Sequence, residues 1–261
     1  MDIQQNIPLA PYTTVKIGGP ADFFVHTKNT KEFIEALDYG QKNNLPITVL
    51  GNGSNILISD SGIRGLVIKN DSNEIELLPE NKVKVSSGTQ LSYLISFTLN
   101  HNLLGLEEFA YIPSTVGGAA AGGTHGIRHL FADYIDSVEK YNNFITSVVL
   151  KLNSGDPSSA KAEMKEIIVK KSAFQSMNSL GSVFKNSIGK DPTGMIVDKA
   201  LNLKGYSIGR AQISPKHGNF ILNNGGATAA DYLALINLIQ SKVQETLGFQ
   251  FELEIKLLGE F

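Results

Sequence analysis

The chain has 261 residues, and its 23 basic and 25 acidic side chains leave a net charge of −2. This balance gives no general attraction to nucleic acid or to an anionic membrane, so we expect a small-molecule partner. The absence of cysteine excludes disulfides, thiolate catalysis and sulfur ligands for a metal. The sequence shows neither a secretory signal nor an apolar stretch of roughly 20 residues. We therefore expect a cytoplasmic protein, and a monomer.

The first region alternates strands with a helix, a pattern typical of a small βαβ unit ending near Asn70. Thr30 is the predicted N-cap of the helix, because its hydroxyl can accept a hydrogen bond from a free N–H of the first turn. The predicted strands are 23–26, 46–50, 55–58 and 65–68, and the predicted helix is 30–43.

A second region of strands and helices follows, and its last two strands are joined by only two residues, Asn142 and Asn143. Turn residues dominate before these strands, up to Tyr134. The predicted strands are 74–78, 82–86, 135–141 and 145–152, and the predicted helices are 91–100 and 158–171.

The third region runs from Ser182 to Gly248 and ends in a long amphipathic helix with Thr228 as its N-cap. A final strand with alternating apolar and acidic residues closes the chain. The predicted helices are 193–200 and 229–247, with short strands around 213 and at 220–222, and the final strand is 251–259.

Two glycine-rich turns are the strongest candidates for binding a phosphate group. The turn Gly51 to Asn55 follows an apolar strand, and the run Tyr111 to Gly123 is rich in glycine and alanine. Glycine lets backbone N–H groups converge on an anion, although a single short glycine motif is more often plain turn geometry. Neither turn has the spacing of a dinucleotide-binding fingerprint or a Walker loop. Together they indicate a nucleotide cofactor held in another way.

A polar set of residues at 181–186 and 209–220 suits an anionic ligand, but solvated loops often hold similar residues. Ser182 lacks the glycine pattern of a hydrolase nucleophile, so His217 does not indicate a catalytic triad. His125 and His129 have no carboxylate at metal-ligand spacing. We therefore predict no metal site.

In order along the chain, these motifs resemble those of the UDP-N-acetylenolpyruvoylglucosamine reductases, the flavoenzyme family also called UDP-N-acetylmuramate dehydrogenases. The resemblance extends over nearly the whole chain. It is carried by NIPLA at 6–10, YTTVKIGGPA at 12–21, LGNGSNILISD at 50–60, IPSTVGGA at 112–119, GSVFKN at 181–186, the segment 205–231 and LEIKLLGEF at 253–261.

The resemblance implies an α+β fold, in which a two-part FAD-binding region of the vanillyl-alcohol-oxidase type (PCMH type) is joined to a smaller α/β substrate-binding domain. The expected domains are 1–70 and 71–175 for the two FAD-binding parts and 176–250 for the substrate. Whether the terminal strand 251–261 returns to the first part stays open. The implied reaction is the NADPH-driven, FAD-dependent reduction of UDP-N-acetylglucosamine enolpyruvate in peptidoglycan precursor synthesis.

The resemblance also implies a role for each site residue. Ser182 is the expected general acid, assisted by Lys185, and Glu254 is the expected carboxylate that helps to protonate or stabilise the enol-like intermediate. Lys185, Asn186, Gln212 and Asn219 are expected to bind substrate. The residues expected to bind FAD are Ile17, Gly18, Gly19, Gly51, Asn52, Gly53, Ser54, Asn55, Ile112, Pro113, Ser114, Thr115, Gly117 and Gly118.

The chain departs from the family pattern at the turn Asn142–Asn143, where the family carries a Tyr-Arg-x-Ser segment. That arginine interacts with the enolpyruvyl end of the substrate, and an arginine grips a carboxylate in a way lysine does not. Arg128 is our candidate substitute. A flavin-binding homologue with lost or altered reductase activity is therefore the second hypothesis. A nucleotide-sugar binding module without redox chemistry is the third.

Overall fold

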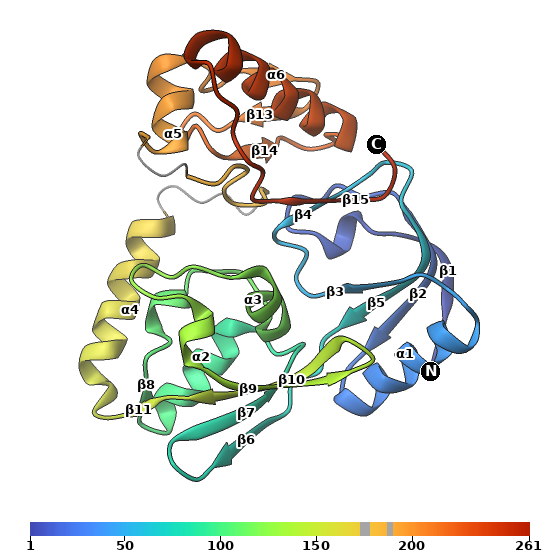
Figure 1. The fold of residues 1–261 in the computed structure, drawn as a ribbon, viewed down its shortest axis with the longest axis vertical. Helices are drawn as coiled ribbons and strands as arrows, with labels where there is room; N and C mark the ends of the chain where they lie inside the picture. Colours follow the sequence, from blue (N-terminus) through green and yellow to red (C-terminus); the bar gives the residue numbers. More distant parts are fainter. Residues whose placement is uncertain (173–177, 187–189) are drawn as a thin grey trace. The chain divides into compact units, whose positions relative to one another are not determined.

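The computed structural model describes residues 1–172, 178–186 and 190–261, which divide into two compact units. Unit 1 comprises residues 1–4, 24–52 and 65–173, and unit 2 comprises residues 5–23, 53–64 and 174–261. Each unit has its own hydrophobic core. Figure 1 follows the chain through both. In the described part of the chain, no helix has the length and apolar character to cross a membrane.

The first sheet contains the predicted βαβ unit. Its strand order is β1 (Gln4–Pro8), β2 (Pro20–Thr27), β5 (Ile63–Asn70) and β3 (Ile47–Leu50). Strands β3 and β5 are parallel, as the intervening α1 (Thr30–Lys42) would allow. The N-cap of α1 is Asn29, whose side chain accepts a hydrogen bond from the Glu32 N–H, so the prediction of Thr30 was one residue late.

A second, antiparallel sheet lies in unit 1 beside three helices, and its apolar face packs on them in one core. The core includes Val83 and Val148 from the sheet and Leu94 and Phe109 from the helical side. The sheet order is β6 (Ile75–Leu78), β7 (Lys82–Ser86), β10 (Phe144–Lys151) and β9 (Ile135–Tyr141), and the helices are α2 (Leu91–Asn100), α3 (Val116–Gly122) and α4 (Pro157–Ser172). A small pair, β8 (Leu103–Leu104) and β11 (Asn153–Ser154), lies alongside.

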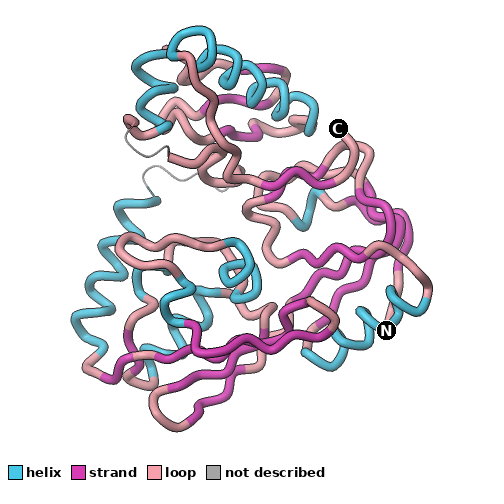
Figure 2. Tube along the Cα trace, in the orientation of Figure 1, coloured by secondary structure: helices cyan, strands magenta, loops and turns pink. Residues whose placement is uncertain are grey.

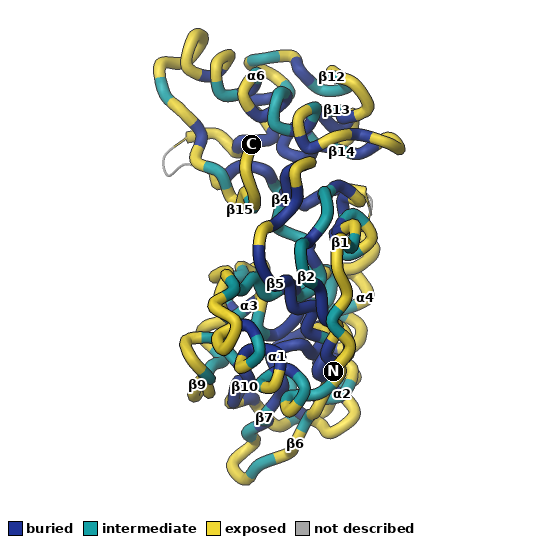
Figure 3. Tube along the Cα trace, turned by 90° about the vertical axis from the view of Figure 1, so that its right-hand side faces the viewer, coloured by how far each residue is buried: buried dark blue, intermediate teal, exposed yellow. Residues whose placement is uncertain are grey.

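The hairpin of β9 and β10 closes on the two residues Asn142 and Asn143, as predicted (Figure 2). Both have positive φ, at 49° and 69°, which matches the tight turn that joins strands of ordinary twist. Tyr141 and Asn142 at its tip bond to α1 of the same unit, through Asp38 Oδ1 at 2.7 Å and Gln41 Oε1 at 2.9 Å. Strand β9 is exposed along most of its length (Figure 3).

Unit 2 packs one long helix on a small sheet. The helix α6 (Ala229–Leu247) begins at Thr228, as predicted, with a reciprocal hydrogen bond to Asp231 that caps its first turn. The sheet consists of β12 (Ser207–Ile208), β13 (Ala211–Ile213) and β14 (Ile221–Asn223). The predicted helix 193–200 is a short α5 (Thr193–Met195) followed by a π-helical turn, Ile196–Ala200.

The predicted terminal strand 251–259 was too long. Only β15 (Lys256–Leu258) pairs with a regular strand, β4 (Ile56–Ile58), in parallel. Residues 251–255 instead run beside residues 183–185 through a single bridge and flanking backbone bonds. Within unit 2 the end of the chain therefore returns to the segment that follows the first glycine turn.

Candidate active site

Gly51 and Thr115 lie against each other, so the two glycine motifs of the sequence meet in unit 1. Gly51 directly follows β3, and Thr115 is the N-cap of α3. A Cβ atom on Gly51 would lie 2.5 Å from the Thr115 hydroxyl oxygen. A side chain at position 51 would therefore push the two motifs apart.

The first turn of α3 has no N–H group to spare for a phosphate. The Val116 N–H donates to the Thr89 carbonyl at 2.8 Å, and the Gly117 N–H donates to the Ser87 carbonyl at 2.7 Å. The Gly118 N–H donates to the Thr115 hydroxyl at 3.2 Å. The motif Ile112 to Gly118, called the α3 wall below, is thus closely packed. The N–H groups at the start of its helix already have acceptors in the protein.

The turn after β3 has the free donors that α3 lacks. Within unit 2 and among the described residues, the backbone N–H groups of Gly53 and Ser54 donate to no protein acceptor. Gly53 is buried, with a φ of 59°, and a Cβ there would lie 2.4 Å from the Tyr12 carbonyl oxygen. A buried N–H without an acceptor is costly unless a ligand supplies one. Successive free donors on such a turn form a cradle for an anion such as phosphate.

The predicted segment Ile17 to Gly19 lies in unit 2, held at both ends by backbone bonds. The Ile17 N–H donates to the Thr13 hydroxyl at 3.2 Å, and the Gly19 N–H donates to the Ser59 carbonyl at 2.9 Å. The neighbouring Thr14 N–H donates to the Gly53 carbonyl at 3.1 Å. This segment therefore supports the unit 2 half of the first glycine turn.

Ser182 and Glu254, the predicted catalytic pair, stand on adjacent segments of unit 2. The Glu254 N–H donates to the Val183 carbonyl at 2.9 Å, and the Lys185 N–H donates to the Glu252 carbonyl at 2.9 Å. Ser182 is half-buried. Among the described residues no group hydrogen-bonds its hydroxyl.

Desolvation raises the pKa of the Glu254 carboxyl above its ordinary value, and the positive charge of Lys185 partly offsets this. The raised pKa increases the fraction of neutral acid. The Lys185 ammonium pairs with Glu252, not with Ser182, so the structure shows no direct contact between Lys185 and the predicted acid.

Asn219 fastens the Ser182 segment to unit 2. Its side-chain oxygen accepts from the Phe184 N–H at 3.0 Å, its amide donates to the Phe184 carbonyl at 2.7 Å, and its own carbonyl accepts from the Val183 N–H at 2.9 Å. The side chain is 4% exposed. The structure thus gives Asn219 a supporting role, which the sequence did not indicate.

The other predicted substrate residues also have protein partners. The Gln212 amide donates to the Gly205 carbonyl at 3.0 Å, and its oxygen accepts from Asn224 at 3.1 Å. The Asn186 oxygen accepts from the Thr193 N–H at 3.0 Å. Each amide still has hydrogen-bonding capacity for a ligand, because an amide group offers two N–H donors and two acceptor lone pairs.

Arg128, the candidate substitute for the missing arginine, bonds to Glu163 of α4 at 2.7 Å. Its loop is held by Glu108, a buried carboxylate that sequence reasoning missed. Glu108 accepts from the N–H groups of Ile127 and Arg128 and from the His129 ring at 2.6 Å. Desolvation is the largest influence on this carboxyl, yet the combined hydrogen bonds outweigh it and hold the pKa below its usual value.

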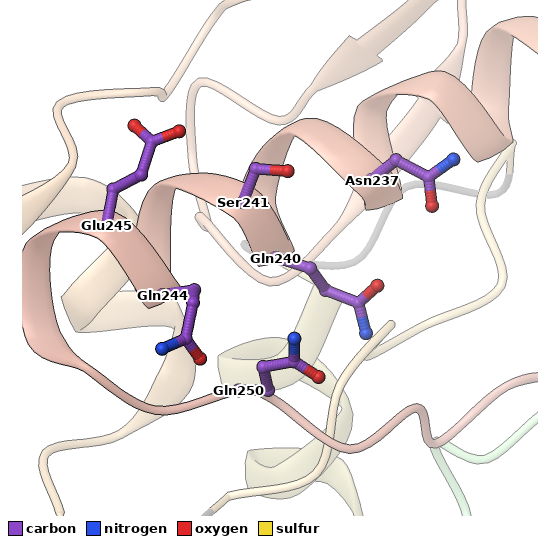
Figure 4. Close-up of a pocket in the computed structure, with 6 residues that line it drawn as sticks. All are labelled: Asn237, Gln240, Ser241, Gln244, Glu245 and Gln250. Carbon is purple, nitrogen blue, oxygen red and sulfur yellow. The ribbon is translucent and has the colours of Figure 1, made fainter.

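The described residues contain no group of three histidines or carboxylates able to hold a metal ion. An open polar groove of about 400 Å³ lies on α6 (Figure 4). Its lining contains none of the predicted site residues; it consists of Asn237, Gln240, Ser241, Gln244, Glu245 and Gln250.

Comparison with known proteins finds one family match in the N-terminal half of the chain and another in the C-terminal part. A family model for an FAD binding domain matches residues 21–143, and one for the C-terminal domain of UDP-N-acetylenolpyruvoylglucosamine reductase matches residues 172–258. The reductase of Listeria monocytogenes is 34% identical, with 99% of this chain and 95% of that protein covered. The chain belongs to the UDP-N-acetylenolpyruvoylglucosamine reductase family.

Other members agree with this assignment. The reductase of Geobacillus kaustophilus is 32% identical over 99% of this chain and 94% of its own length. The crystal structure of the Thermus caldophilus reductase superposes with a TM-score of 0.85 at 29% identity, covering 99% of this chain and all of that one. The fold is therefore the predicted α+β fold of an FAD-binding region joined to a reductase C-terminal domain.

The Listeria alignment spans 286 positions, which is more than this chain contains. That relative therefore carries residues with no counterpart here.

Proposed function

We propose that this protein reduces UDP-N-acetylglucosamine enolpyruvate to UDP-N-acetylmuramate in peptidoglycan precursor synthesis. Family membership supports the reaction class. The observation that carries the proposal is the backbone pairing of the Ser182 segment with the Glu254 segment, through the bond from the Glu254 N–H to the Val183 carbonyl. This pairing places two candidate proton donors, a hydroxyl and a carboxyl, on neighbouring segments.

FAD is the cofactor that the chain's residues fit. The free N–H groups of Gly53 and Ser54 would hold a phosphate of FAD, and the contact of Gly51 with Thr115 would keep the start of the first glycine turn against the second motif. We assign Asn52 to FAD on the family resemblance. We assign Asn55, Ile17 to Gly19 and Ile112 to Gly118 to the same cofactor on the strength of the family resemblance. When bound, FAD supplies the hydride for the substrate and takes its electrons from NADPH.

Ser182 would donate the proton that completes the reduction. Its hydroxyl is a weak acid in water and can act only against a strongly basic centre, such as the carbon that gains negative charge when the double bond accepts hydride. Glu254 would act beside it. Because its raised pKa favours the neutral acid, Glu254 can donate a hydrogen bond to an enolate oxygen more readily than an ordinary carboxylate.

The sugar nucleotide would bind near the same segments of unit 2. We propose Lys185, Asn186 and Gln212 as ligand contacts, with Lys185 exchanging its exposed partner Glu252 for a substrate anion. An exposed ion pair of this kind is worth at most about 1 kcal/mol, so the exchange is cheap. Asn219 would serve mainly by holding Phe184, and thereby the Ser182 segment, in place. We further propose three domains at the predicted limits, a monomer, and a cytoplasmic location.

The structure weakens the case for Arg128 as the substitute for the missing arginine, because its guanidinium is paired with Glu163. The alternative of a flavin-binding homologue with altered activity rests on the two-residue turn Asn142–Asn143, which lacks the arginine segment. We prefer the reductase because the pairing of the Ser182 and Glu254 segments is intact.

The deciding experiment measures flavin content and NADPH oxidation with and without UDP-N-acetylglucosamine enolpyruvate. Ser182→Ala and Glu254→Gln should each keep the flavin absorption band while losing most substrate-dependent oxidation. Ser96→Ala and Glu166→Gln, exposed changes on α2 and α4, are the matched controls. A yellow protein that never turns over would favour the altered homologue, and a protein that binds no FAD would refute both readings.

A further inference from the structure

A buried polar network centred on Asn70 supports the segment to which the α3 wall is hydrogen-bonded. This residue ends β5 and is 2% exposed. Its amide donates to the Ser87 hydroxyl at 2.9 Å, and its side-chain oxygen accepts from the Ser72 N–H at 3.1 Å. Ser72 is fully buried and accepts from the Gly88 N–H at 3.2 Å. Every bond of the network lies within unit 1.

This network holds residues 87–89, and the first turn of α3 is hydrogen-bonded to the same residues. The Ser87 carbonyl accepts from the Gly117 N–H, and the Thr89 carbonyl accepts from the Val116 N–H. The Thr89 hydroxyl in turn donates to the Ser72 carbonyl at 3.3 Å. A displacement of residues 87–89 would therefore be passed to α3 by two backbone hydrogen bonds.

The chemistry of asparagine fits this position and few other side chains would. One end of its amide donates to a hydroxyl and the other accepts from a backbone N–H. An ionised aspartate could accept but not donate, and an apolar side chain would leave the Ser72 N–H without an acceptor in a dry interior. Asn70 thus fixes the distance between the end of β5 and the segment 87–89.

We propose that Asn70 is a positioning residue for the FAD site, acting through Ser87 on the α3 wall. The proposal rests on the proposed function, in which the wall from Ile112 to Gly118 contacts FAD. The side-chain hydrogen bonds of Asn70 go to Ser87 and Ser72, which lie outside the predicted cofactor motifs. Its effect on the cofactor travels through the Ser87 carbonyl, to Gly117, and to Thr115, which abuts Gly51.

The test compares FAD affinity and the visible spectrum of bound flavin in the full-length protein. Asn70→Ala should weaken FAD binding by about tenfold or more, as expected for the loss of buried hydrogen-bond partners, and should shift the flavin absorption envelope. Thr98→Val is the control, since its buried hydroxyl bonds to the Ile95 carbonyl within α2. It should lower the melting temperature without changing affinity or spectrum.

A double-mutant comparison tests the route through Ser87. Asn70→Ala and Ser87→Ala should be strongly non-additive in FAD affinity, because either change breaks the same bond. If Asn70→Ala folds poorly, Ser72→Ala tests the network in another way: it keeps the bond from the Ser72 N–H to Asn70 and removes only the hydroxyl that accepts from the Gly88 N–H. Wild-type FAD affinity and spectrum in both Asn70→Ala and Ser72→Ala would overturn the proposal while leaving the reductase assignment intact. Failure of the wild type to bind FAD would overturn both.

Discussion

Gly53→Ala tests the anion cradle directly, because two separate costs coincide at this position. Gly53 has a φ of 59°, and an added Cβ would lie 2.4 Å from the Tyr12 carbonyl oxygen. The left-handed conformation alone costs an alanine about 1–2 kcal/mol. The steric overlap comes on top of this and can be relieved only by moving the turn that carries the free N–H groups.

Gly248→Ala separates these two costs. Gly248 ends α6 with a φ of 74°, and a Cβ there would have open space around it. Both variants should lose about 1–2 kcal/mol of unfolding free energy from the backbone conformation. Only Gly53→Ala should also weaken FAD binding, by about tenfold for each 1.4 kcal/mol of displacement cost in the bound state.

The assay is a titration of the apoprotein with FAD, followed by flavin fluorescence, alongside urea unfolding of both variants. Loss of stability in Gly53→Ala with wild-type FAD affinity would refute the reasoning. The free donors would then have to be satisfied by something other than the cofactor. An equal loss of affinity in Gly248→Ala would refute it too, because the effect would follow general destabilisation and not the turn.

Four further predictions follow from single contacts. Glu254→Gln should remove most turnover while leaving the unfolding free energy at pH 7 equal or higher, because a carboxyl with a raised pKa destabilises the fold as pH rises from its ordinary pKa through the raised value. Asn219→Ala should cost about 2–4 kcal/mol in urea unfolding, since the Phe184 N–H and carbonyl both lose a buried partner. Glu108→Gln should make the unfolding free energy fall less steeply as the pH is lowered into the acid range. Its pKa is lowered, so its contribution is present above the ordinary carboxyl pKa and is lost as pH falls through the folded value. Arg128→Ala should leave KM for the sugar nucleotide unchanged, and a large rise would show that Arg128 exchanges its partner for substrate.

Much of the fold follows from patterns local in the sequence. The long helix α6 begins at Thr228 because a hydroxyl N-cap and an acidic residue three positions on form a reciprocal pair. The hairpin at Asn142 was predictable because asparagine tolerates the positive φ that a two-residue turn demands. In both cases the determining residues are within a few positions of one another.

What the sequence could not supply depends on distant partners. In the sequence the segment of α3 looks like a turn, because its three glycines disfavour a helix. In the structure Thr115 and the carbonyls of residues 87 and 89 stabilise this helix. The terminal strand was predicted too long because the segment before Lys256 follows residues 183–185. Glu108 went unnoticed because its partners lie about twenty residues on, although an acidic pair between apolar residues was a usable signal.

The short hairpin bears on how a reductase of this family could work without the arginine segment. Its strands pair up to Tyr141 and Phe144, and Tyr141 and Asn142 bond to α1. Three features stabilise the two-residue connection: the paired strand ends, the positive φ of both turn residues, and the hydrogen bonds from the tip to α1. Positive charge for the substrate must therefore come from another part of the chain. Lys185 is the first candidate, because its ammonium already acts on Glu254 and its partner Glu252 is exposed.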